Sequence, residues 1–130
     1  MQSPYNAHNI DIKSERVARV ALKTFFNIMR EWHVSEAQQV ILLGTPSFEV
    51  YKNWRCGIVS PIDDDTLTRI STIITIYKNL GLLFSLRKQA NDWVHKPNDA
   101  FKGASALDVI SSGHLSQMHQ IIKYLNNQLH

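Results

Sequence analysis

The chain has 130 residues, of which 44% are hydrophobic and 19% are charged, and its formal net charge is +3. This is the composition of an ordinary globular domain, so it excludes a chain that is disordered throughout. The slight basic excess is compatible with binding to nucleic acid but does not require it.

An arm and a long helix are the first elements that the sequence predicts. Residues 1–13 are polar and show no periodic pattern, so we expect a flexible arm. From Ser14 onward, apolar residues recur at steps of three and four, which indicates one buried face of a helix. That face comprises Val17, Ala18, Ala21, Leu22, Phe25, Ile28, Met29 and Trp32. Four cations lie off it, namely Arg16, Arg19, Lys23 and Arg30.

Two short helices joined by a tight turn come next. Ser35 caps the first of them, over residues 36–43, and Gln38 stands where a capping box needs it. Gly44 ends this helix, because glycine enters the left-handed conformation without a steric penalty. A second helix follows at once over residues 47–55. The two lengths and the turn together predict a helix–turn–helix.

A long helix begins the second half of the chain. Three successive aspartates from Asp63 place negative charge at its first turn, where the helix dipole favours it. The helical period continues to Phe84, with Gly81 a mild flaw near the end. The pattern is completed by a helix over residues 86–94, a loop over 95–104, and helices over 105–113 and 115–125.

The predicted fold class is therefore all-α. We expect a flexible arm at residues 1–13, a helix–turn–helix domain at 14–62 and a small helical domain at 63–130. The amino terminus lacks a basic region followed by an apolar run, and no segment approaches the roughly 18 unbroken apolar residues of a membrane span. A cytoplasmic protein that does not associate with membranes is the simplest expectation.

No group of residues predicts a catalytic or metal site. The six histidines are scattered, and no two have the four-residue spacing that places both imidazoles on one helix face. Cys56, the single cysteine, excludes a disulfide framework within one chain and has no base near it in the sequence. We therefore expect a protein that is not an enzyme and that holds neither a metal nor a cofactor.

The three tryptophans fit different places in a helical fold. Trp32 lies on the apolar face of the first helix, so we expect it in the core. Trp54 and Trp93 stand near helix ends, where they fit either the core or an interface with a partner.

The second helix of the helix–turn–helix carries side chains suited to DNA. Cations there can contact phosphates, and an amide can read a base edge. The candidate residues are Ser47, Lys52, Asn53 and Arg55. Phe48 and Glu49, at the front of the same helix, disfavour phosphate. Any two helices joined by a glycine turn give this pattern, so a purely structural interpretation stays open.

Several stretches, in order along the chain, resemble the Xre/MbcA/ParS-type antitoxins. Those similar to the helix–turn–helix half of that family are residues 42–44 and 46–47 with Trp54. Those similar to its central helix and proline–asparagine loop are residues 65–71, 76–80, 83–84 and 93–101. Those similar to its last helices are residues 105–108, 112–113 and 123–126.

The resemblance implies the antitoxin of a type II toxin–antitoxin pair, in which an Xre-like helix–turn–helix half precedes a small helical toxin-binding domain. Its partner would be a RES-like toxin that consumes NAD, or a related ADP-ribosyl transferase, whose substrate pocket the carboxy-terminal half would block. The amino-terminal half would form a homodimer and bind operator DNA, so that the complex represses its own operon. The residues expected to contact the toxin are Trp93, Asn98, Phe101, Lys123, Tyr124, Asn127 and Gln128.

Two other classes of protein remain as alternatives. A stand-alone transcriptional regulator would use the same helix–turn–helix without any toxin partner. An enzyme is the least supported alternative, because no set of side chains suggests a reaction.

Overall fold

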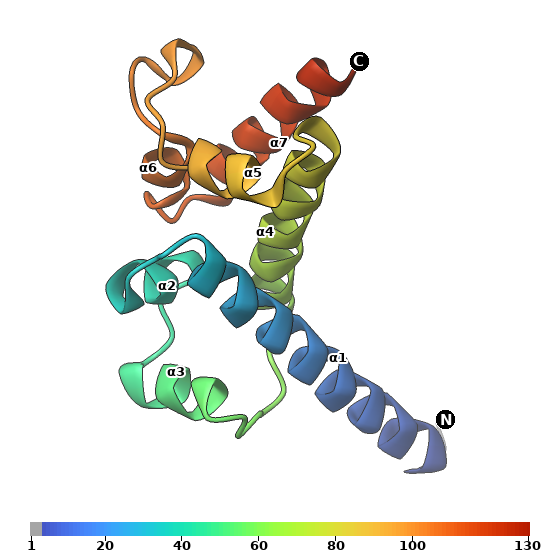
Figure 1. Ribbon diagram of the computed structural model, residues 1–130. Helices are drawn as coiled ribbons and strands as arrows, with labels where there is room; N and C mark the ends of the chain where they lie inside the picture. The colour runs from blue at the N-terminus through green and yellow to red at the C-terminus, as the bar shows by residue number, and fades with distance from the viewer. Residues whose placement is uncertain (1–3) are drawn as a thin grey trace.

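The computed structural model describes residues 4–130, with side-chain surroundings from Glu15 onward. Within these residues the chain forms seven α-helices and one short 3-10 helix, and no strand, which confirms the all-α class. Their order is α1 (Pro4–Glu31), α2 (Glu36–Leu42), α3 (Phe48–Arg55), α4 (Asp64–Leu83), α5 (Arg87–Trp93), η1 (Asp99–Phe101), α6 (Ala106–Ile110) and α7 (Leu115–Leu129) (Figure 1). None of these helices has the length and apolar character that crossing a membrane requires.

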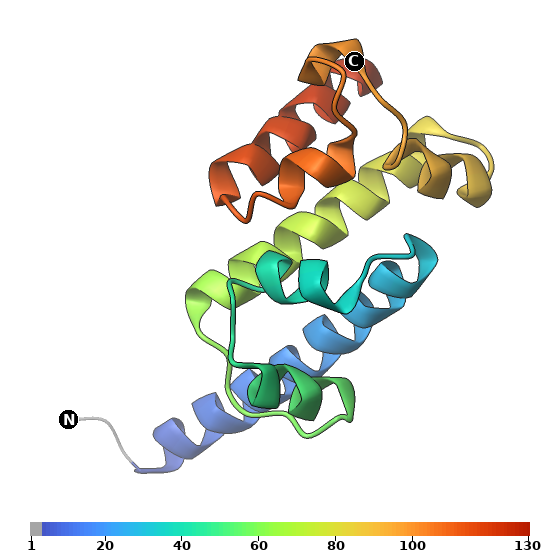
Figure 2. The same cartoon turned by 90° about the vertical axis from the view of Figure 1, so that its left-hand side faces the viewer.

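The first helix is longer than the sequence predicts. It begins at Pro4 rather than Ser14, so residues 4–13 of the expected flexible arm are helical, while residues 1–3 lie outside the described residues. Pro4 suits a first helical turn because its missing N–H would have no partner there. The amino-terminal turns of α1 extend beyond the other helices (Figures 1 and 2). The apolar period begins near Ser14, but the helix itself begins ten residues earlier, at Pro4.

The buried face of α1 is narrower than predicted. Ala18, Leu22 and Phe25 are buried, but Val17 is 48% exposed. Side chains advance by about 100° per residue around a helix, so Val17 lies well to the side of the line through those three. The packing face is therefore centred on Ala18, Leu22 and Phe25.

Helix α4 forms the centre of the fold. It makes extensive contacts with α1 and with α7, and both of these helices cross it in Figures 1 and 2. Its isoleucines point to the core at helical spacing: Ile70, Ile73 and Ile76 are buried, as is Leu80 one turn on. One continuous hydrophobic cluster contains residues of both predicted domains. The boundary expected near residue 62 falls in the loop before α4, yet the two parts share one core.

The helix starts follow the caps that the sequence shows. Ser35 and Gln38 form the expected capping box at α2, and Ser105 forms another with Asp108 at α6. Ahead of α4, the Asp63 carboxylate accepts a hydrogen bond from the Thr66 amide at 2.8 Å. These caps satisfy backbone N–H groups that have no partner inside the helix.

Replacing the cap of α4 tests whether the central helix depends on it. We expect Asp63→Ala to lower the free energy of unfolding by about 1 kcal/mol, because the Thr66 amide loses its acceptor. Asp64→Ala is the matched control: it removes a carboxylate from the same turn, which has only the weaker dipole contribution. Urea denaturation at neutral pH measures both.

The same variant has a predicted pH dependence. The hydrogen bond from the Thr66 amide lowers the pKa of Asp63 in the folded state. The stabilisation is therefore present above the unfolded pKa of Asp, roughly 3.9, and is lost as the pH falls through the lower folded value. An Asp63→Ala deficit that persists unchanged at the acid end of this range would contradict the capping role.

Candidate functional site

The turn between α2 and α3 is fixed by buried polar contacts. The Tyr51 hydroxyl of α3 donates to Gln39 Oε1 of α2 at 2.7 Å, and Gln39 Nε2 donates to the carbonyl oxygen of Val34 at 3.0 Å. Burial raises the pKa of Tyr51, so this phenol stays protonated and remains a donor across the neutral range. Gly44 takes a φ of +91° in the turn, as expected for a glycine that ends a helix. The orientation of α3 relative to α2 is thus well specified.

All four predicted DNA-contacting residues are exposed on α3 or at its start. Ser47 is the cap of the helix, and its hydroxyl accepts from the Val50 amide at 3.2 Å. Lys52 and Asn53 are exposed, and Arg55 forms an ion pair with Glu36 of α2. Lys52 and Arg55, three residues apart, share one side of α3, and part of the Arg55 charge is already paired. Asn53 is exposed on another side of the same helix, because side chains advance by about 100° per residue.

An exposed aromatic ring interrupts this surface. Phe48 is 52% exposed and stacks on Tyr51 with the ring centroids 5.9 Å apart. The Lys52 ammonium lies 5.1 Å from the centroid of the Phe48 ring, within the range of a cation–π contact. The front of α3 is accordingly part apolar and part cationic.

The predicted toxin-contacting residues divide into two groups. The first group is an aromatic cluster with its asparagine. Tyr124 of α7 stacks on Trp93 at 6.1 Å between centroids and meets Phe101 edge-on at 5.2 Å. Asn98 caps η1 by accepting from the Ala100 amide at 2.9 Å and lies 3.5 Å from the Tyr124 hydroxyl. Because Phe101 is buried, this cluster holds the loop after α5 against α7.

The second group is exposed on α7. Lys123 and Asn127 are exposed, whereas Met118, Ile121 and Leu125 on the opposite face are buried. Gln128 follows Leu125 by three residues, so it lies on the buried side of α7 and is exposed because the helix ends there. The helix is therefore anchored through one face and presents the other to solvent. No described contact of the fold covers these three polar side chains.

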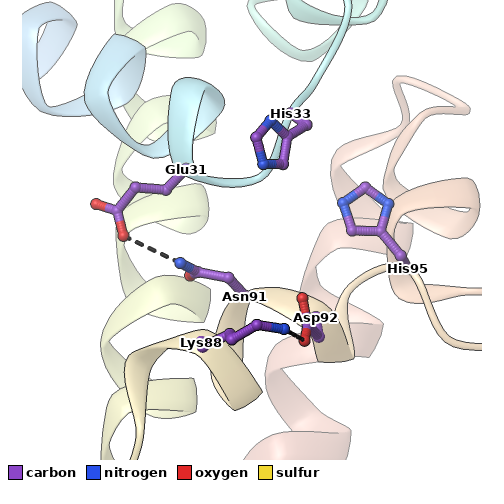
Figure 3. Close-up of a pocket in the computed structure, with 6 residues that line it drawn as sticks. All are labelled: Glu31, His33, Lys88, Asn91, Asp92 and His95. Atoms are coloured by element: carbon purple, nitrogen blue, oxygen red, sulfur yellow. Dashed lines mark hydrogen bonds and ion pairs between the residues drawn. The ribbon is translucent and has the colours of Figure 1, made fainter.

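The sequence did not reveal a pocket where α5 meets the end of α1. Its volume is about 380 Å³, and its lining residues are Glu31, His33, Lys88, Asn91, Asp92 and His95 (Figure 3). It brings His33 and His95, expected to be unrelated, to facing positions. Within the described residues no cluster of histidine, cysteine or carboxylate side chains is suited to a metal ion.

Most polar groups of this pocket are already engaged in packing. The Glu31 carboxylate accepts from the Tyr77 hydroxyl at 2.9 Å and from Asn91 Nδ2 at 3.2 Å. His95 Nε2 lies 2.6 Å from the carbonyl oxygen of Trp32. Burial raises the pKa of Tyr77, with the neighbouring Glu31 carboxylate acting in the same direction. The pocket thus joins α5 to α1 and α4 and lacks a free nucleophile–base pair.

The described features define an all-helical protein with two exposed polar surfaces, one on α3 and one on α7. A relative named "Uncharacterized protein y4oB", from Sinorhizobium fredii (strain NBRC 101917 / NGR234), is 36% identical over 129 residues, which are 98% of each chain. The chain belongs to the same family as this protein. It matches no protein-family profile, and no solved structure matches it.

Tyr124 tests whether the aromatic cluster is structural. We expect Tyr124→Ala to cost about 2 kcal/mol or more of unfolding free energy, because two aromatic contacts and buried area are lost. Tyr124→Phe should cost less than about 1 kcal/mol, because the contact with Asn98 is long for a hydrogen bond. Asn127→Ala, on the exposed side of the same helix, is the control, and equal losses for Ala and Phe at position 124 would refute a packing role.

Proposed function

We propose that this chain is the antitoxin of a type II toxin–antitoxin pair. In this proposal it neutralises an NAD-consuming, RES-like toxin by covering the toxin's active site with its carboxy-terminal part. The ordered series of sequence stretches supports the family assignment, and the exposed polar face of α7 supports the location of the contact. A blocking protein of this kind needs shape and anchoring groups rather than catalytic residues.

The face of α7 suits an inhibitor because its scaffold is already ordered. Met118, Ile121 and Leu125 fix the helix to the core, so docking costs little backbone entropy. Lys123 and Asn127 are four residues apart and hence neighbours on the outer face. A stable complex buries about 1,600 Å² in total, so further residues around α7 would complete the interface.

The two groups of predicted residues take different parts in this proposal. The aromatic cluster fixes the loop that flanks α7, so it would support toxin binding indirectly, by holding that loop in place. It comprises Trp93, Phe101 and Tyr124 with Asn98. Lys123, Asn127 and Gln128 would touch the toxin directly, with the ammonium of Lys123 suited to a carboxylate in the substrate pocket.

Truncation before Leu115 is a poor test of this contact, because it removes core residues as well as the exposed face. The double variant Lys123→Ala/Asn127→Ala changes only exposed side chains. We expect it to fold normally and to lose at least about tenfold in affinity for the toxin, with reduced protection of growing cells. Isothermal titration calorimetry with the purified product of the neighbouring gene measures the affinity.

Ser71→Ala/Lys78→Ala is the matched control, since it also removes one exposed lysine and one exposed polar side chain, in this case from α4. It should retain full affinity. Unchanged binding by the α7 variant would show that the toxin contact lies elsewhere.

We further propose that the protein, as a homodimer, binds operator DNA through α2 and α3 and represses its own operon. Lys52 and Arg55 would contact phosphates, Asn53 would read a base edge and Ser47 would lie beside the backbone. The exposure of all four residues along α3 supports this placement.

Two variants of this surface are expected to act in opposite directions. Lys52→Ala/Arg55→Ala should weaken DNA binding and reduce the slope of log affinity against log salt by about 2. Glu36→Gln should strengthen binding, because it releases Arg55 from its ion pair. Fluorescence anisotropy with the upstream DNA of the gene measures both. If both variants bind as the wild-type chain does, the DNA contact lies elsewhere.

A stand-alone regulator is the second candidate function, and the exposed α3 surface favours it equally. The two candidates differ in the partner alone. Specific binding to upstream DNA without a RES-like neighbouring gene product would favour the regulator.

A further inference from the structure

A row of cations follows one face of α1. It contains Arg16, Arg19, Lys23 and Arg30, with Asn27 completing the spacing of three, four, four and three residues. This spacing keeps all five side chains on one side of a helix, and all five are exposed. Because a helix rises about 1.5 Å per residue, the row is roughly 21 Å long.

The row faces the end of α3 across a hollow of about 400 Å³. Arg19, Lys23 and Arg30 line it from α1, and Arg55 lines it from α3, together with the rings of Phe26 and Trp54. No carboxylate is among the lining residues. The hollow therefore gathers four cations from two helices that are distant in the sequence; we name these four residues the cationic groove.

The groove continues on both sides of Arg55. A neighbouring hollow of about 340 Å³ shares Phe26, Arg30 and Arg55 with it and adds His33. A third hollow adds Lys52 beside Arg55. Positive charge thus runs from α1 to the surface of α3 that is proposed to bind DNA.

The nearby carboxylates leave most of this charge uncompensated. Glu36 pairs with Arg55, and Glu31 is held by Tyr77 and Asn91. Glu15 stands one helical turn before Arg19, but the two form no ion pair in the described part of the chain. The groove holds four of the fourteen Lys and Arg residues of a chain whose formal net charge is only +3. Like charges four residues apart on a helix, such as Arg19 and Lys23, oppose folding slightly, so a polyanionic ligand would relieve this repulsion.

We propose that the cationic groove binds the sugar–phosphate backbone of duplex DNA next to the segment that α3 contacts. The length of the row suits a polymer rather than a single phosphate: the row is roughly 21 Å long, whereas successive phosphates of one DNA strand rise by only about 3.4 Å along the axis of the duplex. The hollows connect the cations of α1 to Lys52 on α3, so one DNA molecule could contact both helices. A helix in the major groove has phosphate backbone on either side, which would place the groove against that backbone. This inference rests on the DNA-binding part of the proposed function.

The proposal separates two kinds of residue. Arg19, Lys23 and Arg30 hold phosphates and raise affinity for any sequence, because phosphates carry no sequence information. Asn53 on α3 belongs to the part of the surface that distinguishes sequences. Substitution in the groove should therefore leave the preference for one DNA sequence over another unchanged.

The test uses Arg19→Gln/Lys23→Gln/Arg30→Gln in the full chain. Binding to a random-sequence duplex of about 30 base pairs is followed by fluorescence anisotropy at several salt concentrations. We expect the slope of log affinity against log salt to fall by about 2.7, and affinity at low salt to fall at least about tenfold. Lys78→Gln/Lys96→Gln/Lys102→Gln removes the same charge from exposed positions elsewhere and should change the slope far less. Thermal melting establishes that both variants are folded.

The outcomes separate this proposal from operator recognition. The wild-type chain could bind all duplex sequences equally, while the groove variant still shows a smaller slope of log affinity against log salt. That result would refute operator recognition and support the groove assignment. An unchanged slope in the groove variant, equal losses in the two triple variants, or no duplex binding by the wild-type chain would overturn the groove assignment. Tighter binding to a single strand of the same length would also overturn it, because the ligand would not be a duplex.

Discussion

The packing of α4 between α1 and α7 is the constraint on which the rest of the structure depends. Ile70, Ile73, Ile76 and Leu80 of α4 are buried in one core that contains residues of both halves of the chain. Arg69 adds a polar link, since its guanidinium bonds to the Asp65 carboxylate at 2.8 Å and to the carbonyl oxygen of Gly113 at 2.6 Å. The α3 surface and the outer face of α7 are therefore held on one scaffold, so a partner on one of them binds a protein that is already ordered.

The sequence predicted the elements well because their signals are local. The apolar spacing of α4, the capping box at Ser35 and the turn at Gly44 each depend on neighbours within a few residues. The start of α1 was missed because a helix continuous with a packed one needs no apolar period of its own. Gly81 looked like a flaw in α4, and in the structure the Arg87 guanidinium of α5 lies in the space beside it. That neighbour comes from another helix and could not be read from the residues around Gly81.

The candidate sites were predicted less completely, because they depend on tertiary contacts. The cations of α1 were visible as residues off the apolar face, but only packing places them opposite Arg55. Likewise, Trp93, Phe101 and Tyr124 were grouped as toxin contacts, whereas their mutual stacking gives them a structural part. His33 and His95 meet at one pocket although 62 positions separate them in the sequence. Residues with the right chemistry could be named in advance, but their assignment to core or surface could not.

In the proposed function this chain supplies a surface and another protein supplies the chemistry. The most direct measurement is the NAD turnover of the protein encoded by the neighbouring gene, with and without the purified full-length chain. We expect an equimolar amount of the chain to abolish turnover and the two proteins to elute together. Undiminished turnover in the presence of excess chain would refute the proposed inhibition.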